Sequence, residues 1–309
     1  MIANFFDKTK PATIFIIAAL LFVYYFTATF LLHSAELSFN FLVKRISFFV
    51  LIALLLMIGN FIVKKNKLTK DNSYALLLIV ILLGTFPEAM FSYKIVLANM
   101  ALIFGFRKIY SLRSGVDTKL KIFDACFWIG IATIFYSWSI FFVLLVYLGM
   151  IIHQKTTVKN LFIPIVGFVT PMVIYFTYCL YFENAAFFYD KFSYGINLDF
   201  SSYTSLKLII PIVFLLMVVL WSLLKVTPKV FSVRNNFKFS WDVLINHLLI
   251  SVAVVILAPS KNGAELFFLI FPSAVIVANL VQNTKSKIIR NGILCLFLLI
   301  SIGVYFDNL

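Results

Sequence analysis

The run PATIFIIAALLFVYYFTATFLLH occupies residues 11–33 and contains no Asp, Glu, Lys or Arg. About 20 consecutive apolar residues are enough for an α-helix to cross a bilayer core of roughly 30 Å. Lys8 and Lys10 precede this run, as basic residues precede the core of a secretory signal peptide. However, the apolar core is long and no small-residue cleavage site follows it. The run therefore predicts a retained first membrane span.

The rest of the chain has the same apolar character. Of its 309 residues, 63% are hydrophobic and only 12% are charged, and Phe alone accounts for 37. This composition lies far outside the balance of a soluble domain. Backbone groups in lipid must bond to one another, which leaves helices or a closed barrel, and continuously apolar runs favour helices. The predicted fold class is all-α, a polytopic transmembrane helical bundle that forms a single integral membrane domain over residues 1–309.

Apolar runs divide the chain into about eleven predicted spans. The region 122–152 is ambiguous, since it fits either two short helices around Tyr136-Ser137-Trp138-Ser139 or one long bent helix. The predicted spans lie near residues 11–33, 46–63, 73–86, 94–106, 122–136, 139–152, 160–182, 207–224, 242–258, 264–281 and 291–306.

The net charge of +14 is distributed in a way that predicts orientation. With eleven spans, most Lys and Arg residues fall on loops of one side, and short cytoplasmic loops carry such an excess. The N-terminus is therefore predicted inside and the C-terminus outside, and no nucleic-acid partner is needed to explain the charge. Only six basic residues fall on the outer side: Lys44, Arg45, Lys94, Lys191, Lys207 and Lys261.

The stretch GTFPEAMFSYK, residues 84–94, places Glu88 between two strongly apolar runs, on the predicted outer side. Pro87 ends the preceding helix and fixes the turn. Lys94 enters the next span. Two interpretations stand: a solvated carboxylate at an ordinary helix boundary, or a functional acid at the outer membrane interface.

The first predicted outer loop holds a second group of polar residues, with His33, Glu36, Lys44 and Arg45 in HSAELSFNFLVKRISFF, residues 33–49. A lipid-linked phosphate would suit the two basic side chains, and Glu36 beside it would be able to deprotonate an acceptor hydroxyl. The alternative is that Lys44 and Arg45 extend toward lipid headgroups at the helix end.

Two further outer segments carry charged residues. The segment 183–206 is predicted to be an outer loop with an interfacial helix, because its aromatic residues alternate with acids and Lys191. The segment APSKNGAELFFLIFPSAVIVANL, residues 258–280, brings Lys261 and Glu265 to the start of a span. These two residues are candidates for substrate contact, although their spacing also permits a local ion pair.

The sequence lacks the motifs of several kinds of chemistry. Cys126, Cys179 and Cys295 each lie in an apolar run without the spacing of a metal site or disulfide. Phosphate-loop, dinucleotide-binding, zinc-protease and esterase signatures are missing from the sequence. No cofactor is predicted, and metal binding is left open.

Two passages, KIFDACFWIGIATIFYSWSIFFVLLVYLGMII and SKNGAELFFLIFPSAVIVANL, resemble parts of the GT-C membrane glycosyltransferases, which use polyprenyl-phosphate sugars. The resemblance covers the layout of roughly residues 70–280. In that class the first two outer loops carry catalytic acids, and by position Glu36 and Glu88 match them. The first loop here is shorter than that of the class and lacks its Asp-containing motif.

The start MIANFFDKTKP also resembles a family of multi-span inner-membrane proteins of Bacteroidota, whose activity is not implied by the resemblance. That resemblance implies a bacterial inner (cytoplasmic) membrane, crossed many times, as the location.

Three functions follow as hypotheses. The first is glycosyl transfer at the outer leaflet on a polyprenyl-phosphate-linked glycan. Here Glu36 would be the general base and Glu88 a second acid or metal-assisting group. Substrate contacts would come from Lys44, Arg45, Lys94, Lys261 and Glu265. The second is a non-catalytic membrane subunit or scaffold of an envelope complex, with partner subunits bound at lipid-facing aromatic residues such as Phe141 or Phe142. The third is a small-solute transporter, for which no paired helix-breaking repeats are found.

Overall fold

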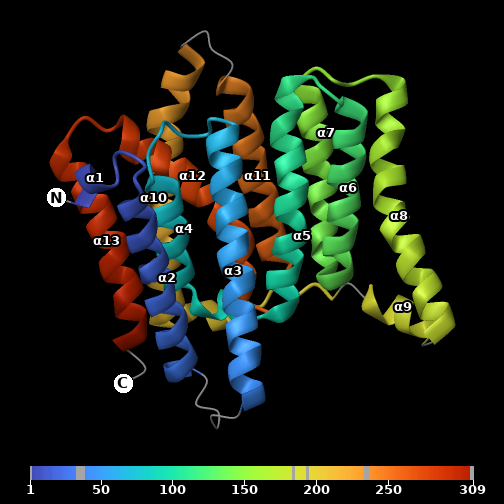
Figure 1. The fold of residues 1–309 in the computed structure, drawn as a ribbon, viewed down its shortest axis with the longest axis horizontal. Coiled ribbons are helices and arrows are strands. Elements are labelled where there is room, and N and C mark those ends of the chain that lie inside the picture. The colour runs from blue at the N-terminus through green and yellow to red at the C-terminus, as the bar shows by residue number, and fades with distance from the viewer. Residues whose placement is uncertain (1, 33–38, 183–184, 193–194, 233–236, 307–309) are drawn as a thin grey trace. The chain divides into compact units, whose positions relative to one another are not determined.

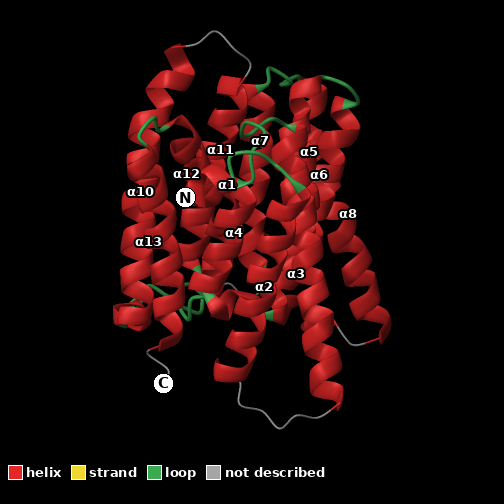
Figure 2. Cartoon of the chain, turned by 60° about the vertical axis from the view of Figure 1, so that its left-hand side comes forward, coloured by secondary structure: helices red, strands yellow, loops and turns green. Residues whose placement is uncertain are grey.

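The computed structural model describes residues 2–32, 39–182, 185–192, 195–232 and 237–306. These residues form helices joined by loops, without a strand among them (Figure 2). The predicted all-α class is thereby confirmed.

Each of the eleven predicted runs overlaps one α-helix, and several of these helices extend beyond the run. These helices are α2 (Pro11–Leu32), α3 (Phe39–Lys65), α4 (Tyr74–Thr85), α5 (Tyr93–Tyr110), α6 (Thr118–Phe135), α7 (Phe142–Ile152), α8 (Val158–Phe182), α10 (Leu206–Ser232), α11 (Phe237–Leu257), α12 (Phe267–Asn283) and α13 (Lys287–Phe306). Shorter elements are α1 (Ile2–Phe5), α9 (Ala185–Lys191) and the 3-10 helices η1 (Pro87–Met90), η2 (Ser111–Ser114), η3 (Ser137–Phe141), η4 (Ser201–Thr204) and η5 (Ala264–Leu266).

Within the described part of the chain, 8 helical segments are long and apolar enough to cross a membrane. The protein is therefore a multi-pass membrane protein. The segments Tyr74–Thr85 and Ser137–Ile152 are apolar but shorter. In α6, Lys119, Lys121 and Asp124 dilute the apolar character of the first half. The count of about eleven spans and the orientation of the termini stay predictions.

The ambiguous region 122–152 contains two helices and not one bent helix. The chain leaves α6 at Tyr136, whose φ of −143° and ψ of 105° are those of extended backbone. It then turns through η3 into α7. The turn coincides with the Tyr-Ser-Trp-Ser sequence.

The helices group into two compact units. Unit 1 comprises Met1–Tyr93, Asp199–Asn235 and Lys261–Leu309, and unit 2 comprises Lys94–Leu198 and Asn236–Ser260. Each unit is described by itself below.

Unit 1 is built around α4 and α12. All twelve residues of α4 are buried, and most of α12 is buried as well. Helices α2, α3 and α13 contact α4, and α10 contacts α12. The ring of Tyr24 packs directly on the α4 backbone, since a Cβ placed at Gly84 would lie 2.6 Å from it. This close packing explains why a short apolar helix can lie in the centre of the unit.

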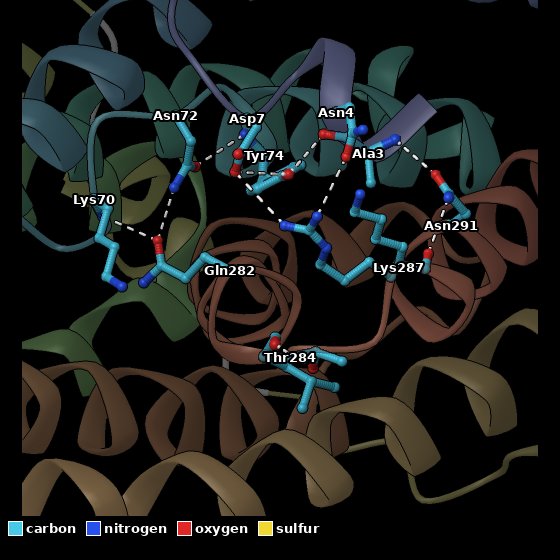
Figure 3. Close-up of polar contacts among 12 residues, drawn as sticks. Ala3, Asn4, Asp7, Lys70, Asn72, Tyr74, Gln282, Thr284, Lys287 and Asn291 are labelled. Carbon is cyan, nitrogen blue, oxygen red and sulfur yellow. Dashed lines mark hydrogen bonds and ion pairs between the residues drawn. The ribbon is translucent and has the colours of Figure 1, made fainter. Parts of the chain in front are cut away.

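A polar cluster closes one end of unit 1, here named the α1 end (Figure 3). The hydroxyl of Tyr74 donates to the carbonyl of Ala3 at 2.7 Å and to Asp7 at 3.1 Å. The Ala3 N–H in turn donates to Asn291 at 2.9 Å. These bonds join α1, the start of α4 and the start of α13.

The same cluster reaches the end of α12. Gln282 accepts hydrogen bonds from the backbone N–H of Lys70 at 2.9 Å and from Asn72 at 2.7 Å. Because every partner is a neighbouring part of unit 1, we interpret the cluster as structural. Its hydrogen bonds satisfy polar groups at the helix ends and join these ends to one another.

Unit 2 contains α5 to α9 and α11, and its closest packing is between α6 and α8. A Cβ at Gly167 would lie 2.6 Å from the carbonyl oxygen of Phe123, and one at Gly130 would lie 2.4 Å from the Pro171 ring. Small residues thus let the two helices approach closely. They run in the same direction (Figure 1).

Two expectations about aromatic residues meet different outcomes in unit 2. Phe142 does not face lipid: it is fully buried, with its ring centroid 5.2 Å from that of Phe106. The predicted outer loop does contain a helix, α9, which begins at Ala185 and ends at Lys191. Its placement at the membrane interface stays a prediction.

Candidate functional site

The end of α4 fixes the position of Glu88. The buried helix stops at Thr85, and Pro87 then begins η1, which contains Glu88. Pro87, Ala89 and Met90 are buried, whereas Glu88 is half-buried. The apolar side chains of η1 therefore anchor the turn and leave the carboxylate near its surface.

The start of α12 fixes the position of Glu265. Gly263 adopts a φ of +93°, a left-handed conformation that favours glycine, and η5 follows at once. Glu265 has no exposed surface. Its Oε1 accepts hydrogen bonds from the backbone N–H of Gly263 at 3.1 Å and from the hydroxyl of Tyr203 on η4.

The second oxygen of Glu265 has a different environment. Within the described residues, Oε2 is buried and has no hydrogen-bond donor. A buried carboxylate oxygen without a donor costs roughly 1–3 kcal/mol or more. Glu265 therefore has one oxygen that is hydrogen-bonded within the fold and one that can accept a proton or a hydrogen bond.

The two short helices η1 and η5 contact each other. Two carboxylates that are far apart in the sequence, Glu88 and Glu265, therefore lie on contacting turns at the same end of unit 1. We name Glu88, Glu265, Lys261 and Tyr203 the carboxylate cluster, and the end of unit 1 that contains it the η1 end.

Lys261 brings a buried cation to this cluster. It is 4% exposed, and its Nζ lies 5.0 Å from the ring centroid of Phe200. Burial lowers the pKa of Lys261 below its usual range, and the negative charge of Glu265 opposes that shift. Lys261 and Glu265 do not lie on one helix as their i,i+4 spacing permits, because Gly263, with its left-handed backbone, comes between Lys261 and the start of η5.

Arg45 adds a second cation at the η1 end. Its guanidinium lies over two aromatic rings, 5.0 Å from the centroid of Phe41 and 4.8 Å from that of Phe91. Phe91 directly follows η1, and its N–H donates to the carbonyl of Glu88 at 3.2 Å. Arg45 is therefore linked to the Glu88 turn through Phe91.

The remaining predicted site residues are Lys44, Lys94 and Glu36. Lys44 is exposed on α3. Lys94 is exposed in the first turn of α5 and belongs to unit 2. Glu36, the predicted general base, lies outside the described residues, as does His33. Its role stays a prediction.

Sequence reasoning missed Tyr203 and Phe200. Both come from the segment after the predicted interfacial helix, where aromatic residues are so frequent that no single one stands out. Their importance comes from tertiary contacts, which a local pattern does not encode.

The arrangement can hold an anion and accept a proton. Lys261 and Arg45 supply positive charge, and the two carboxylates supply proton acceptors. Among the described residues no three His, Cys, Asp or Glu side chains are grouped so as to hold a metal ion.

The fold and this cluster together define a multi-pass helical membrane protein with charged residues buried at one end of a helical unit. The chain belongs to a family of unknown function, DUF6427, whose model matches residues 8–309. No curated protein and no solved structure matches the chain.

Proposed function

We propose that this chain is a bacterial inner-membrane protein that transfers a glycosyl group at the outer leaflet, on a polyprenyl-phosphate-linked glycan. The observation that supports the proposal best is the contact of η1 with η5, which brings together the turns of Glu88 and Glu265, with the buried Lys261 shortly before η5 in the chain. The resemblance of two sequence passages to GT-C glycosyltransferases and the predicted outward orientation of the η1 end support it as well.

The distribution of basic residues within unit 1 fits that orientation. The α1 end carries many more of them than the η1 end, as expected for a cytoplasmic face. Basic residues at or near the α1 end are Lys8, Lys10, Lys64, Lys65, Lys67, Lys70, Lys225, Lys229, Lys285, Lys287 and Arg290; those at or near the η1 end are Lys44, Arg45, Lys207 and Lys261.

In the proposed reaction, an acceptor hydroxyl oxygen bonds to the anomeric carbon of the donor sugar. The bond from that carbon to the lipid phosphate oxygen breaks, and the phosphate keeps the electron pair. The acceptor proton passes to a carboxylate, for which Glu36 is the predicted base and Glu88 the second acid. Lys261 and Arg45 would stabilise the negative charge on the departing phosphate.

The test compares lipid-linked and surface glycans, by mass spectrometry of envelope extracts, in strains that differ only in this chain. A deletion strain and a strain with Glu36→Gln and Glu88→Gln should both accumulate unmodified acceptor. Asp199→Asn is the matched control, because Asp199 is an exposed carboxylate close to η4 in the sequence. Normal glycans in the carboxylate variant, with normal protein level, would refute the proposal.

A second candidate function is a non-catalytic membrane subunit of an envelope complex. The observation that favours it is the hydrogen bonding of Glu265 Oε1 to Tyr203 and Gly263, which is what a carboxylate that only ties η4 to η5 would make. This function predicts normal glycans in every carboxylate variant. Partner contact would then lie on exposed aromatic residues such as Tyr181, which is 81% exposed.

A further inference from the structure

Unit 2 has a cavity of about 470 Å³ where α6 and α8 begin. This volume is in the range of small-molecule sites. None of the residues of the carboxylate cluster belongs to it. The lining residues are Asp117, Thr118, Lys119, Leu120, Gln154, Lys155, Thr157 and Asn160.

Two helix N-termini meet at this cavity. The contacts of Gly130 and Gly167 hold α6 and α8 side by side in the same direction, so both helices begin at the same end. Helix N-termini carry unpaired N–H groups and a partial positive charge, which favour anions. Asp117, which precedes α6, makes no capping hydrogen bond with its side chain.

The charged side chains around the cavity are predominantly positive. Lys119 and Lys155 line it together with a single carboxylate, Asp117. Lys155 also acts on a neighbouring side chain outside the cavity lining: burial first, and then the positive charges of Arg113 and Lys155, lower the pKa of His153 to about 4.

An independent observation points to a ligand that is also a hydrogen-bond donor. Asn160 lines the cavity and is 8% exposed. Its Nδ2 donates to the carbonyl of Lys155 at 2.7 Å, which fixes the orientation of the amide. Its Oδ1 is buried and has no donor among the described residues. Because an unsatisfied buried acceptor costs roughly 1–3 kcal/mol, this oxygen favours a bound group that donates to it.

We propose that this cavity binds a phosphate ester that carries an N–H or O–H donor close to its phosphate, of the phosphoethanolamine type. The phosphate lies between Lys119 and Lys155 at the starts of α6 and α8. The donor group bonds to Oδ1 of Asn160. A phospholipid headgroup and a soluble phosphate ester both have this chemistry.

A comparison of phosphoethanolamine with phosphocholine tests the phosphate contact and the donor contact of the proposal separately. Both carry a phosphate and a positive nitrogen, but the quaternary nitrogen of phosphocholine has no N–H. Isothermal titration of the purified full-length protein, in a detergent without phosphate, should give at least tenfold tighter binding of phosphoethanolamine, since a site built for a donor rejects an analogue that lacks it. This comparison needs no variant, so it does not depend on the folding of a mutant.

Variants assign the binding to the cavity. Lys119→Gln combined with Lys155→Gln should weaken both ligands tenfold or more, and Asn160→Leu should abolish the preference for phosphoethanolamine. Asn99→Leu is the matched control, because Asn99 belongs to the same unit, is also 8% exposed and donates from Nδ2 to a backbone carbonyl, that of Ile95, at 2.9 Å. It should keep the preference.

A further comparison, with phospholipids in place of the soluble esters, identifies the source of the ligand. Native mass spectrometry after addition of phosphatidylethanolamine or phosphatidylcholine should show the same preference if the ligand is a headgroup. A preference seen only with the soluble esters assigns the cavity to a free phosphate ester. Equal binding of the two ligands in both formats, or equal effects of Asn160→Leu and Asn99→Leu, would overturn the proposal and leave an ordered water as the partner of Asn160.

Discussion

Tyr203 donates a hydrogen bond to Oε1 of Glu265, a carboxylate with no exposed surface, at the place where η5 contacts η1. The residues are 62 positions apart in the sequence. The bond ties η4 to the start of the central helix α12, so the same contact serves the stability of unit 1 and the position of a candidate functional acid.

Tyr203→Phe should destabilise unit 1. The variant leaves Oε1 with only the Gly263 N–H, and an under-satisfied buried acceptor costs about 1–3 kcal/mol. We expect a lower thermal midpoint in detergent. Tyr181→Phe is the control, because Tyr181 is 81% exposed, and it should leave the midpoint unchanged. Equal midpoints for the two variants would show that the hydrogen bond contributes nothing to stability.

The carboxylate cluster also gives a prediction that separates stability from function. Glu265→Gln keeps the shape of the side chain and an oxygen acceptor, but it removes the charge beside Lys261. If Glu265 acts only through the fold, glycans in the strain should stay normal whenever the protein level does. If it takes part in glycosyl transfer, unmodified acceptor should accumulate at normal protein level, as detected by mass spectrometry of envelope extracts.

The predicted orientation can be tested at the two ends of unit 1. Ser202→Cys on η4 should react with a membrane-impermeant maleimide added to spheroplasts, because the η1 end is predicted outside. Lys70→Cys should react only after the membrane is opened. Each variant is made in a background without Cys126, Cys179 and Cys295. The reverse pattern of labelling would place the carboxylate cluster in the cytoplasm and contradict outer-leaflet chemistry.

The fold was largely predictable because membrane spans are encoded locally. An uncharged run such as residues 11–33 has to become a helix in lipid, whatever its neighbours are. Even the turn between α6 and α7 coincides with a short polar sequence, Tyr136 to Ser139. Which helices form a centre was not predictable, since nothing in the composition of α4 distinguishes it from the other apolar runs.

The candidate site was predictable only in part, because its residues are brought together by tertiary packing that the sequence does not encode locally. Glu88, Lys261 and Glu265 are conspicuous as rare charges between apolar runs. Their association depends on the contact between η1 and η5, and the role of Tyr203 depends on a bond across 62 residues.

Gly167→Ala should disrupt the packing of α6 on α8. The added Cβ would lie 2.6 Å from the carbonyl oxygen of Phe123, so the helix backbones would have to move apart. We expect a clearly lower thermal midpoint. Gly292→Ala is the control, because nothing lies within 4 Å of its Cβ position in α13. There, alanine should be neutral or slightly stabilising, by up to roughly 1 kcal/mol. Similar midpoints for the two variants would contradict the close approach of α6 and α8.

His153 should make the protein sensitive to acid. Burial and the charges of Arg113 and Lys155 lower its pKa in the folded state to about 4, from the usual 6.5. Between these two values the unfolded chain binds more protons than the folded one, so the free energy of unfolding falls as pH falls from 6.5 to 4. Below pH 4 the contribution of His153 is fully lost, and above 6.5 it is fully present.

His153→Gln removes the titrating group and should flatten this part of the pH dependence. The measurement is the thermal midpoint in detergent at pH 7.5 and at pH 4.5, for the wild type and the variant. Gln154→Asn is the control, because the neighbouring position has a φ of +55°, which Asn tolerates, and carries no titrating group. The control should lose as much stability on acidification as the wild type, and the variant should lose less. An unchanged loss in His153→Gln would show that the acid sensitivity arises at other groups.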